Sequence, residues 1–237
     1  MDKNGILKKF RKWKQRYLFR GDVPDAARVR RAVDKIIERA KRGKDAGMST
    51  DRWLFAFESD FEEISDEIAR LKDDGQTDAY RDIYAQLYLF AKDVMEDSYM
   101  PMYLNIIYRY ACSLLETGKE QTDQMQAEQD GAARSAQANE AHPERTKAMQ
   151  SLQAEAAQKA LRLFEKLYER TDRLIGIGNP YGIHCLEKIA QAALQCGQSE
   201  KASRALREMA SIAEEEFGPH SAMMQAVQRC EARLAQQ

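Results

Sequence analysis

The stretch LEKIAQAALQCGQSEKASRALREMASIAEEEFGPH, residues 186–220, decides the fold class of this chain. On both sides of Gly197 its apolar residues recur at steps of three and four, which is the spacing of an amphipathic helix. Ala190 precedes the glycine and Ala202 follows it, and such small residues let two helices approach closely. The stretch therefore predicts two antiparallel helices joined by a tight turn at Gly197.

A second copy of this hairpin lies upstream in the chain. Five positions of the first helix and its turn match at an offset of 79 residues: Leu186, Ile189, Ala190, Leu194 and Gly197 correspond to Ile107, Tyr110, Ala111, Leu115 and Gly118. Five positions of the second helix match at an offset of 42 residues: Ala202, Leu206, Met209, Phe217 and Gly218 correspond to Ala160, Phe164, Leu167, Ile175 and Gly176. One repeated hairpin, with an insertion between the helices of its upstream copy, explains both offsets.

Residues 186–220 resemble a tetratricopeptide repeat of the kinesin-light-chain-like type, and the split copy, residues 103–118 with 156–180, extends the resemblance. The matching features are Leu186, the pair Ile189-Ala190, Gly197, Ala202 and the closing Gly218-Pro219-His220. The resemblance implies an all-α fold, a short right-handed α-solenoid of antiparallel helical hairpins. The residue pattern of 1–48 adds a basic helical N-terminal segment to this predicted fold. The resemblance also implies a scaffold or adaptor that binds a protein or peptide in a groove. An ordinary helical bundle is the alternative.

The resemblance places the groove on the first helix of each hairpin. The candidate partner-binding residues are Asn105, Tyr108, Arg109, Cys112 and Glu116 in the first copy, and His184, Glu187, Lys188, Gln191 and Gln195 in the second. Such polar side chains can pair with a bound segment, and an aromatic ring adds contact area. Many related repeats carry paired asparagines at the positions of Tyr108-Arg109 and Glu187-Lys188, so an asparagine clamp on peptide backbone is not expected here. The alternative is a solvated helix face, with the array docked on other helices or on a second copy as a homodimer.

The chain divides into four predicted segments. They are a basic helical segment at 1–48, a degenerate repeat and the first helix of a repeat at 49–118, a low-complexity insertion at 119–150 and the C-terminal repeat helices at 151–237. Apolar stripes predict helices at 24–44, 53–71 and 80–94, and a further helix from Pro101 that ends at Gly118. Between Lys119 and Ala148 the only large apolar residue is Met125, so the insertion is expected to be disordered or a solvated helix extension.

The charge is unevenly distributed along the chain. Residues 1–48 hold 16 Lys and Arg against 6 Asp and Glu, a net charge of +10, and the remainder holds 21 against 32, a net charge of −11. This asymmetry indicates either two separate tasks or an internal electrostatic contact.

Residues 6–18, ILKKFRKWKQRYL, have the pattern of a basic amphipathic helix. Its candidate contacts to an anionic membrane surface or an acidic partner are Lys8, Lys9, Phe10, Arg11, Lys12, Trp13, Arg16 and Tyr17. Non-specific nucleic-acid binding is a third alternative, although the chain has no helix-turn-helix signature. In the remaining alternative, Phe10 and Trp13 pack on residues 51–96 and the lysines are solvated.

Several other classes of protein are not expected. No apolar run reaches the length of a membrane span, and the N-terminus lacks a signal-peptide pattern. The four cysteines include no CxxC pair, which favours reduced thiols and a cytoplasmic protein. The chain has no phosphate-binding glycine loop, HExxH motif or nucleophile elbow, and His184, Cys185 and Cys196 do not have zinc-site spacing. We therefore expect no catalytic residue, no metal and no cofactor.

Overall fold

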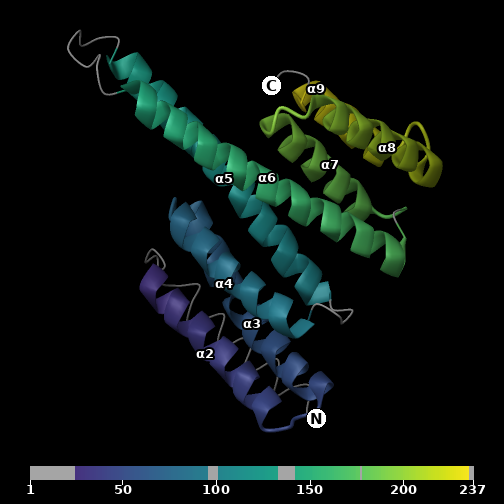
Figure 1. The fold of residues 1–237 in the computed structure, drawn as a ribbon. Helices are drawn as coiled ribbons and strands as arrows, with labels where there is room; N and C mark the ends of the chain where they lie inside the picture. The colour runs from purple at the N-terminus through teal and green to yellow at the C-terminus, as the bar shows by residue number, and fades with distance from the viewer. Residues whose placement is uncertain (1–24, 96–100, 133–141, 177, 235–237) are drawn as a thin grey trace. The chain divides into compact units, whose positions relative to one another are not determined.

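The computed structural model describes residues 25–95, 101–132, 142–176 and 178–234, and every regular element in these ranges is an α-helix (Figure 1). The helices are α2 (Ala26–Asp45), α3 (Thr50–Asp73), α4 (Thr77–Met95), α5 (Pro101–Ala132), α6 (His142–Ile175), α7 (Pro180–Gln195), α8 (Ser199–Phe217) and α9 (Ala222–Leu234). The chain forms two compact units, the first ending at Ala79 and the second beginning at Tyr80. The all-α class predicted from the sequence is confirmed. The predicted segment bounds at 48, 118 and 150 stay a prediction.

In the first unit, α2 packs against α3 through the stripes that the sequence predicts. The buried residues of α2 are Val29, Val33, Ile37 and Ala40, and those of α3 are Trp53, Leu54, Phe57, Phe61, Ile64, Ile68 and Leu71. The steps of three and four place each set on one side of its helix. Gly75 follows α3 with φ of 76°, a left-handed conformation that glycine adopts without a steric penalty.

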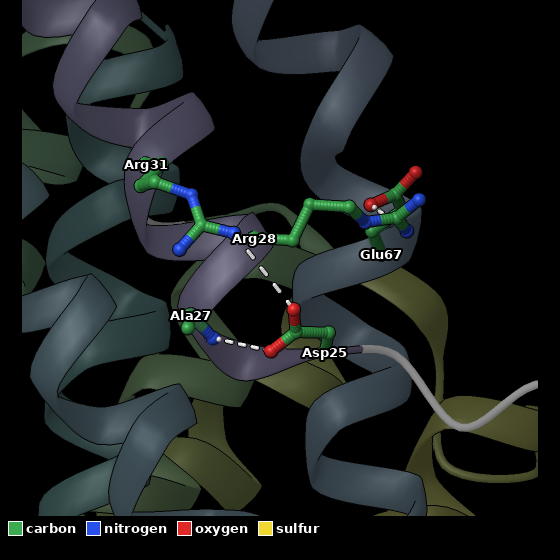
Figure 2. A network of polar contacts seen from close by, with 5 residues as sticks. All are labelled: Asp25, Ala27, Arg28, Arg31 and Glu67. Atoms are coloured by element: carbon green, nitrogen blue, oxygen red, sulfur yellow. Dashed lines mark hydrogen bonds and ion pairs between the residues drawn. The ribbon is translucent and has the colours of Figure 1, made fainter.

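Two ion pairs join the flanks of α2 and α3. Arg28 Nη2 lies 2.9 Å from Glu67 Oε2 (Figure 2), and Arg39 Nη1 lies 2.6 Å from Asp60 Oδ2. The early arginine meets the late carboxylate, so the two helices run antiparallel. Both arginines are largely exposed, and such pairs each contribute only about 0.2–1 kcal/mol. Part of the basic charge of residues 1–48 is thus paired with carboxylates of α3 in the same unit.

The start of α2 gives a first testable prediction. Asp25 accepts a hydrogen bond from the backbone N–H of Ala27 at 3.0 Å and lies 3.9 Å from Arg31 (Figure 2). Replacing Asp25 with alanine removes this N-cap, so the free energy of unfolding should fall by about 0.5–2 kcal/mol. Urea denaturation followed by circular dichroism measures the change. Asp25→Asn keeps the acceptor and loses only the charge, so a loss as large as that of Asp25→Ala would contradict the capping role.

In the second unit each helix from α5 to α9 packs against the next one along the chain. α6 contacts both α5 and α7, and α8 contacts both α7 and α9 (Figure 1). The hairpin predicted from residues 186–220 is confirmed as α7 and α8. Gly197 forms their turn with φ of 68°, and Ala190 and Ala202 are buried. α4 meets α5 through Tyr88 and Tyr110, whose rings stack with centroids 5.1 Å apart.

The prediction that a helix ends at Gly118 is wrong. α5 continues through Gly118 to Ala132, and α6 begins at His142, so these helices have 32 and 34 residues. Glycine costs only about 1 kcal/mol inside a helix, and the Glu-, Gln- and Ala-rich residues that follow favour helix. The described parts of 119–150 are therefore helical, and residues 133–141 lie outside the described residues. In the ranges described, no helix is both long and apolar enough to span a membrane.

Candidate protein-binding face on α5 and α7

The predicted groove residues of α5 lie along one side of that helix. Asn105 and Arg109 are exposed, whereas Tyr108, Cys112 and Glu116 are half-buried. In α7, His184 is exposed, and the four residues Glu187, Lys188, Gln191 and Gln195 are half-buried. None of the ten side chains is part of the fully buried core, so the described structure leaves each of them some access to solvent.

Tyr108 is the point at which α5, α6 and α7 come together. Its ring meets the buried ring of Phe164 edge-on, with centroids 5.9 Å apart, and lies 6.0 Å from the ring of Tyr181. Tyr181 Oη also donates a hydrogen bond to the carbonyl oxygen of Leu104 at 3.4 Å. The first turn of α7 is thereby attached to α5, so the structure brings the two predicted residue sets to one place.

Tyr181 is a residue of this face that the sequence reasoning missed. It follows Pro180 in the first turn of α7, where Asn179 accepts hydrogen bonds from the backbone N–H groups of Tyr181 and Gly182. The Asn-Pro-Tyr sequence was itself a signal for the helix start, because asparagine is a strong N-cap and proline favours the first helical turn. The position of the ring against Tyr108 depends on tertiary packing.

Two thiols lie one helical turn beyond the paired tyrosines, Cys112 after Tyr108 and Cys185 after Tyr181. Burial, with a smaller effect of nearby Cys112, raises the pKa of the Cys185 thiol to about 12. Burial also raises the pKa of Tyr108, and Cys112 and Glu187 raise it further. Residues of α5 and α7 therefore act on one another electrostatically on this face.

Cys185 should be unreactive in the folded protein. At pH 8 its thiolate fraction is lower than that of an unperturbed thiol by about a thousandfold, and only the thiolate is alkylated. We expect iodoacetamide to modify Cys185 about a thousandfold more slowly in buffer than in urea. Mass spectrometry of the tryptic peptides measures the two rates. Half-buried Cys112 is the internal reference. Equal labelling of Cys112 and Cys185 in the folded protein would contradict the prediction.

Two buried tyrosines of α4 lie beside Arg109 of this face. The rings of Tyr80 and Tyr84 are tilted by 59° with centroids 4.8 Å apart, and the Arg109 guanidinium donates a hydrogen bond to the hydroxyl of Tyr80. Burial raises the pKa of Tyr84 to about 12, although Arg109 lowers it. Arg109 forms no ion pair with any residue in the described ranges. An exposed guanidinium can donate hydrogen bonds to an anionic oxygen of a partner.

His184 and Glu187 form a pair at the start of the second residue set. His184 Nδ1 lies 3.5 Å from Glu187 Oε2, and this hydrogen bond raises the pKa of His184 while burial and Lys188 lower it. Because the folded pKa is raised, any stability from the pair is present below the ordinary histidine value and is lost as the pH rises through the folded value.

The His184–Glu187 pair predicts the direction of a pH titration. Replacing Glu187 with glutamine should move the NMR titration midpoint of His184 down, because the charged acceptor is lost. Replacing Lys188 with glutamine should move the midpoint up, because a repelling cation is removed. The two shifts have opposite signs in the same residue, so each variant is the control for the other. An unchanged midpoint in Glu187→Gln would show that the pair is absent in solution.

The far end of the face contains an unused acceptor. Gln195 Oε1 is buried and has no hydrogen-bond partner, whereas Gln191 Oε1 accepts a hydrogen bond from Lys188 Nζ at 3.2 Å. A buried acceptor without a donor costs about 1–3 kcal/mol.

The N-terminal candidates from Lys8 to Tyr17 lie outside the described residues, so their predicted contacts remain predictions. Within the described part of the chain, no group of three or more His, Cys, Asp or Glu side chains is arranged to hold a metal ion. The sequence matches no protein-family model, and no curated protein has a significant match to it.

Proposed function

We propose that this protein is a non-catalytic scaffold or adaptor that binds an extended protein segment along the face formed by α5 and α7. The observation that carries the proposal is the junction of Tyr108 with Tyr181, which unites polar residues of two helices far apart in sequence. The repeated hairpins supply the framework, and their stacking in a short right-handed solenoid of tetratricopeptide type belongs to the same proposal.

The polar groups of this face favour a particular kind of segment. Arg109, with the hydroxyls of Tyr80 and Tyr84 beside it, suits a carboxylate side chain of the partner. The half-buried side chain of Gln195 suits a polar group of the partner, and the half-buried rings of Tyr108 and Tyr181 suit an apolar side chain. The preferred partner is therefore an extended segment with an acidic residue at one end and an apolar residue at its centre.

The test compares two matched variants of the full chain. Arg109→Gln with Gln195→Met removes the cation and the acceptor from the face. Arg162→Gln with Arg204→Gln removes two exposed cations from α6 and α8 as the control. Tyr108 is left intact because it packs on Phe164, and its loss would mix folding with binding.

Quantitative affinity capture from the source cells, followed by titration of the recovered partner, gives the result. We expect the face variant to bind the partner about tenfold or more weakly, which corresponds to about 1.4 kcal/mol. The control should bind as the unmodified chain does, and circular dichroism should show the same helicity in all three proteins. Equal affinity of the face variant and the control would overturn the proposal.

A further inference from the structure

The outer face of α3 is an exposed stripe that the packing of α2 against α3 leaves uncovered. It consists of Asp51, Phe55, Ser59, Glu62 and Asp66, at steps of four, four, three and four, all exposed. Phe55 is 70% exposed, the largest fraction among the large apolar side chains of the described residues. The buried stripe, with Phe57, Phe61 and Ile68, lies on the opposite side of the helix. α3 thus presents one aromatic ring flanked by carboxylates.

Most carboxylates of α3 form no ion pair in the described part of the chain. The helix holds eight Asp and Glu against three Lys and Arg, and only Asp60 and Glu67 pair with arginines of α2. No ion pair in the described part of the chain involves the others, which are Asp51, Glu58, Glu62, Glu63, Asp66 and Asp73. Uncompensated like charges on one face repel one another, so a cationic neighbour would stabilise this surface.

The chain itself contains a segment of complementary composition. Residues 6–18 hold six Lys and Arg and no Asp or Glu, and Ile6, Phe10, Trp13 and Tyr17 share one side at helical spacing. A segment of this composition matches the outer face of α3 in both charge and aromatic content.

Chain connectivity allows this segment to reach α3. The ion pair between Arg28 and Glu67 shows that α2 starts next to the C-terminal end of α3, where Asp66 lies. Seven residue steps separate Leu18 from Asp25, a reach of about 23–25 Å, which is twice the diameter of a helix. α2 itself has eight Lys and Arg against three Asp and Glu, so it repels a basic segment and α3 attracts it.

We propose that residues 6–18 dock on the outer face of α3 as a basic amphipathic helix. Phe10 and Trp13 pack against Phe55, and the lysines and arginines pair with Glu62, Asp66 and their neighbours. The docked segment is shielded from anionic surfaces, so a membrane or nucleic acid binds it only by competing with α3. This contact does not depend on the face formed by α5 and α7.

Acrylamide quenching of tryptophan fluorescence in the full chain tests the proposal. The chain has two tryptophans, and Trp53 is buried, so changes in quenching report on Trp13. The test variant is Glu62→Lys with Asp66→Lys, and the control is Glu200→Lys with Glu214→Lys, two exposed carboxylates of α8. We expect the quenching constant to rise about twofold in the test variant, because reversed surface charge pairs each shift the docking equilibrium a few-fold. The control should match the unmodified chain.

A charge exchange separates docking from a local disturbance of α3. Adding Lys9→Glu and Lys12→Glu to the test variant should return the quenching constant to that of the unmodified chain, because the attraction is restored with opposite signs. Equal quenching in the unmodified chain and the test variant overturns the proposal. So does a charge exchange that fails to restore protection, or a Trp13 that is protected only when phosphatidylserine vesicles or duplex DNA are added.

Discussion

Replacing Phe164 with alanine should lower the free energy of unfolding of the second unit by about 3–5 kcal/mol, the usual cost of removing a buried aromatic ring. Phe164 is 0% exposed and lies on α6, between α5 and α7. Its ring supports Tyr108 edge-on, and Tyr108 in turn contacts Tyr181. The substitution therefore leaves a cavity and also removes an aromatic contact worth about 0.5–1.5 kcal/mol beyond its buried area.

Urea denaturation monitored by circular dichroism at 222 nm measures this loss. Leu152→Ala is the matched control, because Leu152 lies on the same helix and is 62% exposed. Surface substitutions of this kind change stability by about 0.5 kcal/mol at most. If Phe164→Ala unfolded at the same urea concentration as Leu152→Ala, the aromatic junction would not exist in solution.

The sequence predicted the helices whose signals are local. The stripe of Val29, Val33, Ile37 and Ala40 is buried in α2, and the hairpin around Gly197 forms where the apolar spacing and small residues indicated it. Both signals depend on the 3.6-residue period and on a glycine that tolerates positive φ, and neither requires knowledge of distant residues.

The length of α5 and α6 could not be predicted in the same way. Gly118 matches Gly197 in the repeat alignment, but Gly197 has φ of 68° whereas Gly118 remains inside a helix. A glycine ends a helix only when the following residues gain more by leaving it, and after Gly118 the chain continues with good helix formers. The insertion thus lengthens two helices. The difference between the two repeat offsets shows only that residues are inserted, and it is the same whether they form a loop or longer helices.

The sequence predicted which residues belong to the candidate face, but it did not predict which of them lie next to one another in space. The family resemblance placed Tyr108, Arg109 and Cys112 on the groove side of a helix, but Tyr80 and Tyr84 were predicted only as members of the apolar stripe of residues 80–94. Their approach to Arg109 depends on the packing of α4 against α5, which no local pattern encodes. The charge asymmetry likewise allowed two interpretations until the pairs of Arg28 and Arg39 with α3 identified part of it as internal.

Replacing Ala160 with leucine should lower the free energy of unfolding by about 1–3 kcal/mol, because extra methyl groups do not fit a well-packed helix contact. Ala160 is 0% exposed and lies on α6, which contacts α5 on one side and α7 on the other. Ala154→Leu makes the same chemical change at an exposed position of the same helix, so helix propensity and side-chain entropy are matched. Urea denaturation of the two variants isolates the packing cost. If both variants were as stable as the unmodified chain, α6 would not approach its neighbours closely at Ala160, and the interpretation of the paired alanines as hairpin contacts would be wrong.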